Sequence, residues 1–190
     1  IEEQRTLPYE VIIADDGSTN HTKEVVTSFQ EKSDIRVIHS WQKDSGFRAA
    51  KSRNKAIAKS KADYLILIDG DMILHPKFIQ DHINNAEISC FIQGTRSLLT
   101  EDVTEDAIKK MRINFSFLSQ GIKNRKNTIY SNFLSSLFLK KKKYLSGIKT
   151  CNMSFFKEDF INVNGFNNDF EGWGREDSEF VVRLLNAGIM

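Results

Sequence analysis

Residues 64–71 read Tyr-Leu-Ile-Leu-Ile-Asp-Gly-Asp (YLILIDGD) and decide the fold class of this 190-residue chain. Five consecutive apolar residues are typical of a strand that is buried on both faces of a parallel sheet. The run passes directly into Asp69-Gly70-Asp71, which places two carboxylates where the strand leaves the sheet. The stretch therefore predicts an α/β fold with acidic groups at one edge of its sheet.

The sequence before this stretch repeats the pattern of strand and loop. Residues 9–14 (YEVIIA) form a compact β-branched run that ends in Asp15-Asp16, and residues 35–39 predict a second short strand. A helix is expected after the first strand, and residues 48–59 carry apolar side chains at helical spacing. This alternation predicts a mostly parallel sheet flanked by helices.

The second half of the chain departs from this alternation. Residues 107–139 predict an irregular, mostly helical insertion, and residues 152–156 predict another strand. A final helix is expected over residues 177–186. Residues 1–10 read as the end of a helix and a connector, so we expect the first strand of the fold to be missing from this chain.

Composition is that of an ordinary globular protein, with 40% hydrophobic and 27% charged residues and a net charge of +2. Its length suits one α/β domain. Ten Lys or Arg and no acidic residue lie between Lys109 and Lys143, whereas acidic residues gather at the strand ends and over residues 158–179. A basic stretch and an acidic site are expected together in a protein that handles anions or rests on an anionic surface.

Targeting features are absent from the sequence. Cys90 and Cys151 match no metal or redox spacing, and we interpret them as reduced thiols. No signal peptide is visible, and the apolar stretch over residues 129–139 is shorter than the roughly 20 residues that span a bilayer. We therefore expect a cytoplasmic protein.

The two acidic strand ends predict a shared ligand site. Ligands of open α/β sheets bind at the carboxyl ends of the strands, where Asp15-Asp16 and Asp69-Gly70-Asp71 would lie. Neighbouring carboxylates repel each other unless a cation compensates them, and hard oxygen ligands suit Mg²⁺ or Mn²⁺. In an extended segment, Asp69 and Asp71 would point to the same side. The alternative is that both motifs are polar loop starts.

A basic motif lies between these acidic strand ends. Gly46-Phe47-Arg48 precedes a helix that carries Arg53 and Asn54. Guanidinium groups near the same sheet edge would contact phosphate oxygens in bidentate fashion. On spacing alone, solvated arginines on an amphipathic helix are an equal alternative.

A third motif, Glu171-Gly172-Trp173-Gly174-Arg175-Glu176-Asp177, precedes the last helix. Asp177 falls in the first turn of that helix, where the helix dipole favours the ionised carboxylate that a general base requires. Trp173 offers a flat apolar face to a sugar ring. The alternative is an acidic helix cap beside a structural tryptophan.

Together these motifs resemble family 2 glycosyltransferases, most closely the branch of bacterial chondroitin-polymerase-type enzymes. The last segment is also similar to the Gly-Trp-Gly-x-Glu-Asp motif of β-1,4-galactosyltransferases. The matching segments, in chain order, are residues 10–18, Gly46-Phe47-Arg48 with Arg53-Asn54, Asp69-Gly70-Asp71-Met72, and residues 172–177.

The resemblance implies a GT-A fold, a UDP-sugar donor, Mn²⁺ or Mg²⁺, and inversion at the anomeric carbon. It implies that Asp15 and Asp16 hold uracil and ribose, and that Asp69 and Asp71 hold ribose and the metal-diphosphate. The expected donor-binding set is Asp15, Asp16, Gly46, Arg48, Arg53, Asn54, Asp69, Gly70, Asp71 and Trp173.

The resemblance also assigns the chemistry. Asp177 is expected to act as the catalytic base, with Glu176 and Trp173 contacting the acceptor or donor sugar. Residues 1–105 would form the nucleotide-sugar-binding half of one domain, and residues 106–190 the acceptor-binding and catalytic half. A saccharide or glycolipid acceptor in bacterial polysaccharide or glycolipid biosynthesis is implied, and no nucleic-acid partner is expected.

One ligand of the family's metal site has no counterpart here. Related enzymes have a metal-binding His shortly after the last helix, a position that falls beyond Met190. We interpret the four histidines of this chain as ordinary loop and surface residues; they are His21, His39, His75 and His82.

Two other functions and a membrane contact are alternatives that the sequence leaves open. A nucleotidyltransferase also uses strand-end carboxylates with a metal, but no Gly-rich phosphate loop with a Lys is present. A catalytically inactive nucleotide-sugar-binding module would bind nucleotide without transfer. The basic segment ending in Lys140–Lys143 predicts either an ordinary core-facing helix or peripheral contact with the inner face of the membrane.

Overall fold

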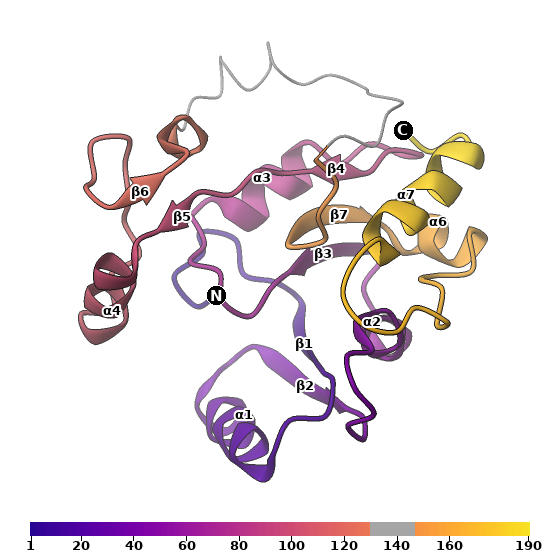
Figure 1. Cartoon of the computed structure of the whole chain (residues 1–190), viewed down its shortest axis with the longest axis horizontal. Helices are drawn as coiled ribbons and strands as arrows, with labels where there is room; N and C mark the ends of the chain where they lie inside the picture. Colours follow the sequence, from indigo (N-terminus) through magenta and orange to yellow (C-terminus); the bar gives the residue numbers. More distant parts are fainter. Residues whose placement is uncertain (130–146) are drawn as a thin grey trace.

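The computed structural model describes residues 1–129 and 147–190 (Figure 1). The helices are α1 (Asn20–Lys32), α2 (Ala49–Lys59), α3 (Phe78–Asn84), α4 (Glu101–Lys109), the 3₁₀ helix η1 (Arg125–Thr128), α6 (Lys157–Asn162) and α7 (Glu176–Asn186). The strands are β1 (Glu10–Asp15), β2 (Arg36–Trp41), β3 (Tyr64–Ile68), β4 (Ile92–Gln93), β5 (Leu98–Leu99), β6 (Ile122–Lys123) and β7 (Asn152–Phe156).

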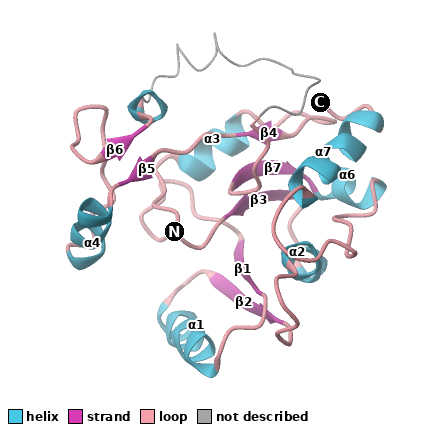
Figure 2. Ribbon diagram, viewed as in Figure 1, coloured by secondary structure: helices cyan, strands magenta, loops and turns pink. Residues whose placement is uncertain are grey.

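The first half begins with a parallel β-α-β unit, as the sequence predicts. β1 and β2 pair in parallel from Glu10 opposite Arg36 to Asp15 opposite Trp41. Helix α1 connects them and packs on β2, and α2 packs on β1 (Figure 2). The carboxyl end of β1 therefore carries Asp15 and Asp16 toward the start of α2.

The strand β3 has a different partner from the one that simple alternation predicts. It pairs antiparallel with β7, which in turn pairs antiparallel with β4. The prediction of parallel pairing is therefore confirmed for β1 and β2, whereas the sheet formed by β3, β7 and β4 is antiparallel. This reversal places the beginning of β7 beside the end of β3, because Ile68 lies opposite Asn152.

The main core is built largely from phenylalanines of the second half. Phe155 of β7, Phe160 of α6 and Phe180 of α7 are stacked or tilted against one another, and Phe166 completes the cluster. Residues of α2 and β3 pack on the same cluster, so the two halves of the chain share one core. This core fixes α7, which bears Asp177, against the β3–β7 sheet.

The region between β5 and residue 129 is less helical than the sequence predicts. α4 ends at Lys109, and the chain continues through turns, β6 and η1. β5 and β6 form a small antiparallel ribbon beside α4, at the left of Figure 1. The rest of the predicted helical stretch, residues 130–139, lies outside the described residues.

Candidate active site

Asp177 lies in the first turn of α7, as the sequence predicts, and three donors hold its carboxylate. The backbone N–H of Thr150 donates to Oδ2 at 2.9 Å, and the Thr150 hydroxyl donates to Oδ1 at 3.0 Å. Arg53 Nη1 donates to Oδ1 at 3.2 Å. A carboxylate accepts about four hydrogen bonds, so roughly one acceptor position is left for a further donor.

The surroundings of Asp177 raise its pKa above the usual aspartate range. Burial is the largest cause, and the neighbouring Glu176 charge acts in the same direction. Thr150 and Arg53 oppose the rise, since their hydrogen bonds and charge favour the ionised form. The result is a carboxylate of increased basicity whose side chain is 21% exposed and so remains reachable from solvent.

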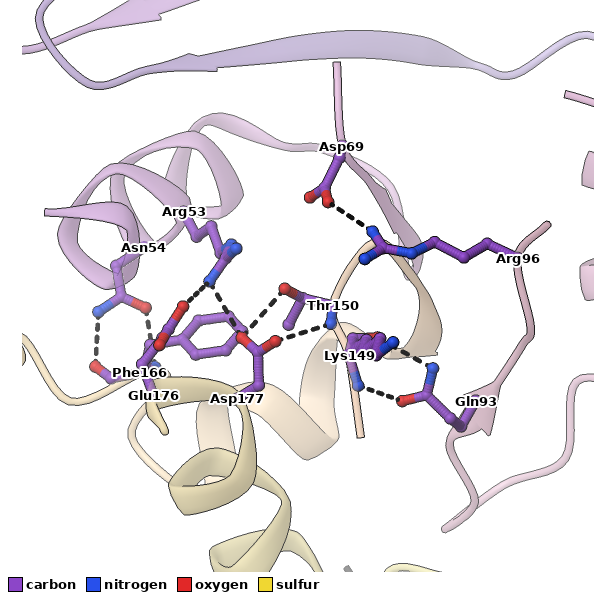
Figure 3. A network of polar contacts seen from close by, with 10 residues as sticks. All are labelled: Arg53, Asn54, Asp69, Gln93, Arg96, Lys149, Thr150, Phe166, Glu176 and Asp177. Carbon is purple, nitrogen blue, oxygen red and sulfur yellow. Dashed lines mark hydrogen bonds and ion pairs between the residues drawn. The ribbon is translucent and has the colours of Figure 1, made fainter. Parts of the chain in front are cut away.

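Arg53 and Asn54, adjacent on α2, fix two parts of the chain that follow β7. Arg53 Nη1 also donates to Glu176 Oε1 at 3.1 Å, so it bridges the two acidic residues at the start of α7. Asn54 donates to the Phe166 carbonyl and accepts from its N–H. These contacts connect α2 to α7 and to the loop that precedes it (Figure 3).

Asp69 reaches the same site through the β3–β7 pairing. It directly follows Ile68, which lies opposite Asn152, and Thr150 precedes Asn152 by two residues. The charge of Asp69 acts on the thiol of Cys151, the residue between them. Figure 3 draws Asp69 facing the Asp177 network, with Arg96 Nη1 at 3.7 Å from Asp69 Oδ2.

The Asp69-Gly70-Asp71 segment forms a turn, so the expectation of an extended segment with parallel side chains is wrong. Asp71 is exposed, and nothing lies within 4 Å of a side chain built at Gly70. Two carboxylates beside open space fit Mg²⁺ or Mn²⁺, which binds one or two carboxylates and takes further oxygens from a substrate diphosphate. Among the described residues, no group of three or more His, Cys, Asp or Glu is arranged to hold a metal ion.

Asp15 and Asp16 differ in how many contacts their carboxylate oxygens already make within the protein. Asp15 Oδ1 accepts from the N–H groups of Gly17 and Ser18, and Oδ2 contacts the Ser18 hydroxyl and His39 Nε2. Among the residues that the structure describes, Asp16 accepts two hydrogen bonds, from Gln42 Nε2 and the backbone N–H of Arg48. Asp16 therefore keeps acceptor capacity that Asp15 lacks.

The turn after β1 requires glycine at position 17. Its φ is +98°, and a side chain there would meet the backbone of Asp44 at 2.5 Å. The close approach brings the loop that contains Gly46 against the Asp15-Asp16 turn. The acidic turn and the Gly46-Phe47-Arg48 motif, which the sequence placed in one site, therefore lie together.

The loop that carries Trp173 is tied to the Gly46-Phe47-Arg48 motif. Gly172 donates its N–H to the Phe47 carbonyl at 2.9 Å, and Arg48 forms an ion pair with Glu171. Trp173 itself is 92% exposed. The indole is therefore accessible from solvent, and Arg48 contacts protein carboxylate and backbone groups of the loops around it.

Sequence reasoning missed several residues of the site. The interpretation of His39 and His82 as loop and surface residues is wrong, because His39 contacts Asp15 and His82 is buried against Asn152 and Ser154. Thr150 and Arg96 carried no local signal either. Their partners are remote in sequence, and the pairing of β7 with both β3 and β4 brings them to the site.

The proposed membrane-contact residues Lys140–Lys143 lie outside the described residues. Of the helices within residues 1–129 and 147–190, none has both the length and the apolar character needed to span a bilayer.

Comparison with protein families identifies the class. A model described as "Glycosyl transferase family 2" matches residues 1–160, and one described as "N-terminal domain of galactosyltransferase" matches residues 134–190. This chain belongs to glycosyl transferase family 2. The family predicted from the sequence motifs is thereby confirmed.

Individual relatives support the same family. Validoxylamine A glucosyltransferase of Streptomyces hygroscopicus subsp. limoneus is 30% identical over 98% of this chain and 43% of its own length. Chondroitin synthase of Pasteurella multocida is 26% identical over 99% of this chain and 21% of its own length. This chain thus spans less than half of the length of either relative.

A solved structure supports the fold. The crystal structure of S. aureus TarS matches 96% of this chain and 29% of that protein, with a TM-score of 0.53 at 17% sequence identity. Together with the family, this likeness confirms the predicted GT-A-like α/β fold.

Proposed function

We propose that this protein transfers a sugar from a UDP-sugar to an acceptor hydroxyl with inversion at the anomeric carbon. The observation that carries the proposal is the convergence of Asp177 and Asp69 at the beginning of β7. Thr150 holds the first carboxylate, and the β3–β7 register brings the second alongside. A partly buried carboxylate beside a strand-end acidic turn supports the proposal, because it supplies a proton acceptor next to groups that could hold a cation.

In the proposed reaction Asp177 acts as the general base. The acceptor hydroxyl donates to the carboxylate, loses its proton to it, and forms a new bond to the anomeric carbon as the bond to the diphosphate breaks. Burial raises the pKa of Asp177, which strengthens it as a proton acceptor. Thr150 and Arg53 favour the ionised form of the carboxylate and fix its orientation.

Asp69 and Asp71 are proposed to hold Mn²⁺ or Mg²⁺ together with the donor diphosphate. The ion would supply Lewis-acid stabilisation of the leaving group. The open space at Gly70 supports this assignment because it leaves room for a bulky group beside both carboxylates.

Asp16 is proposed to contact the uridine moiety, since two of its acceptor positions remain after Gln42 and Arg48 bind it. Asp15, whose carboxylate already has four contacts, would shape the turn that carries Asp16. Exposed Trp173 would stack on a sugar ring, with Glu176 and Arg53 fixing the helix behind it.

The acceptor is proposed to be a saccharide or glycolipid of bacterial polysaccharide biosynthesis, reached at the inner face of the membrane. The family supports a sugar acceptor, and the basic segment at Lys140–Lys143 motivates the location.

A donor screen tests the proposal. The purified protein is incubated with a panel of UDP- and GDP-sugars, with and without Mn²⁺, and release of the nucleoside diphosphate is measured with mono- and oligosaccharide acceptors. We expect acceptor-stimulated, Mn²⁺-dependent release of UDP from one donor, with the opposite anomeric configuration in the product by NMR. Nucleotide binding without release or transfer from any donor would instead favour an inactive binding module.

A further inference from the structure

Arg96 is a charged residue beside the candidate site that the sequence motifs left out. It lies three residues after the short strand β4, and its guanidinium faces Asp69 (Figure 3). The 3.7 Å separation exceeds ordinary hydrogen-bond distance, and both side chains are about one-third or more exposed, at 33% for Arg96 and 42% for Asp69. Exposed pairs of this kind contribute little to stability, so Arg96 can exchange this contact for a stronger one at small cost.

The backbone that carries Arg96 is held firmly even though its side-chain contact is weak. Asn152 of β7 donates to the Thr95 carbonyl at 2.9 Å, and the N–H of Gly94 donates to the Asn152 carbonyl at 2.8 Å. A side chain at position 94 would lie 2.2–2.3 Å from the Asn152 amide. Only glycine therefore allows this close contact between the Arg96 segment and β7.

Asn152 is in turn fixed by a buried polar network. His82 contacts Asn152 Oδ1 at 3.0 Å through Nε2 and the Ser154 hydroxyl at 2.7 Å through Nδ1. Burial lowers the pKa of His82, so its imidazole is neutral and connects Ser154 to Asn152 without adding a charge. This uncharged hydrogen-bond network fixes Asn152, and through Asn152 the backbone at Thr95, the residue before Arg96.

The charges around Arg96 favour an anion. Arg96 and Lys149 both act to lower the pKa of the Cys151 thiol, although burial raises it overall. Two cationic side chains therefore lie close to the start of β7, on the side of the site occupied by Asp69. A guanidinium binds phosphate oxygens with two parallel hydrogen bonds, an arrangement that the long contact to Asp69 and the hydrogen bond to the Cys151 thiol do not provide.

We propose that Arg96 is a donor-binding residue that contacts the diphosphate of the nucleotide sugar and rests on Asp69 when no donor is bound. The inference depends on the proposed transferase function and adds the residue that recognises the leaving group. Asp69 and Asp71 would hold a cation when the donor binds, and Asp69 would then no longer pair with Arg96, whose guanidinium would be free to contact the phosphate oxygens.

Calorimetric titration of the protein with UDP and with uridine tests the assignment. The variants are Arg96→Gln, Arg96→Lys and, as a matched control, Arg112→Gln, which removes an exposed arginine stacked on Phe115. Hydrogen bonds to charged groups are worth about 1.5–3 kcal/mol, so Arg96→Gln is expected to weaken UDP binding roughly 10- to 100-fold and leave uridine binding unchanged. Arg96→Lys should lose less, because it keeps the charge without the bidentate geometry.

The exchange with the cation has its own readout. Electron paramagnetic resonance of Mn²⁺ without nucleotide should show several-fold tighter Mn²⁺ binding in Arg96→Gln, because the competing guanidinium has gone. Unchanged or weaker Mn²⁺ binding would overturn the exchange.

The outcomes separate this inference from the proposed function. If the unmodified protein binds UDP and transfers sugar while Arg96→Gln binds UDP within twofold of it, the role of Arg96 is refuted and the function stands. Equal loss of UDP and uridine binding would also refute it, since that points to general distortion. Failure of the unmodified protein to bind either UDP or GDP would refute the function itself.

Discussion

Asp15 and Asp177 are both aspartates shielded from solvent at the ends of regular elements, and their environments shift their pKa values in opposite directions. Burial acts to raise both. At Asp15, hydrogen bonds from Ser18 and His39 outweigh it and lower the pKa, and four contacts occupy the carboxylate. At Asp177 burial wins, and three donors leave roughly one acceptor position open.

This difference distinguishes a carboxylate that holds a turn together from one that is available for chemistry. A saturated, stabilised carboxylate is a poor proton acceptor, whereas a destabilised one with a free lone pair is a good one. The four predictions that follow test the comparison, beginning with the largest expected effect.

Removing the proposed base should have the largest effect. We expect Asp177→Asn to lower turnover by about 10²–10⁴-fold, the usual contribution of general-base catalysis, and to leave UDP affinity nearly unchanged. Steady-state kinetics and UDP titration measure both quantities, with the exposed Asp34→Asn as a control. More than about a tenth of normal turnover in the variant would contradict the base assignment.

Removing one proposed metal ligand should act on binding. Asp71→Ala is expected to abolish the Mn²⁺-dependent part of UDP binding, because a single carboxylate then remains at the turn. Calorimetry with and without Mn²⁺ measures this, with Asp34→Ala as the matched control. An unchanged titration would refute the role of Asp71.

Replacing Asp15 or Asp177 by Asn should change the stability of the fold in opposite directions. The lowered pKa of Asp15 contributes stability at neutral pH that is lost as the pH falls through that pKa, so Asp15→Asn should destabilise the fold at pH 7. We expect a loss of about 1.5–3 kcal/mol, at roughly 2–4 °C in Tm per kcal/mol.

The raised pKa of Asp177 has the opposite consequence. Folding favours its protonated form, and that contribution is lost as the pH rises through the folded-state pKa, so Asp177→Asn should raise Tm at pH 7. Thermal unfolding scans at pH 4 and pH 7 measure both variants. If Tm shifted in the same direction in both variants at pH 7, the opposite pKa shifts of Asp15 and Asp177 would be contradicted.

The smallest effect is expected from a partner of the base. Thr150→Val removes the hydroxyl that donates to Asp177 Oδ1, which favours the ionised carboxylate. The pKa of Asp177 should then rise further, and the acid limb of the kcat–pH profile should move to higher pH. Thr150→Ser keeps the hydroxyl and should leave the profile in place; if both variants shift equally, the hydrogen bond is not the cause.

The sequence predicted much of the fold because the relevant signals are local. The apolar run before Asp69 and the β-branched run before Asp15 form strands at the expected places, and Asp177 begins the last helix. The pairing of β3 could not be read in the same way. Its partner β7 lies more than 80 residues away, beyond a region with irregular periodicity, and an antiparallel neighbour leaves no mark on β3 itself.

For the candidate site, the motifs selected acidic and basic residues but not their partners. Arg53 and Asp177 are separated by 124 positions, and no pattern in either segment indicates their contact. The interpretation of His39 and His82 failed for the same reason. His82 is a polar residue on the short helix α3. It is buried because it packs against Asn152 of β7, which lies 70 residues later in the chain.

By itself, then, the sequence determined which segments become strands and helices, which carboxylates end them, and the family to which the chain belongs. The strands, helices and their ends follow from hydrophobic spacing and turn residues within a few positions of each other, whereas the family follows from the resemblance of four motifs along the chain. Only the tertiary structure decided that four contacts occupy the Asp15 carboxylate, that the pKa of Asp177 is raised, and that Arg96 faces Asp69. Burial and hydrogen bonding between remote segments set those properties, because the free energy of a charge depends on everything packed around it.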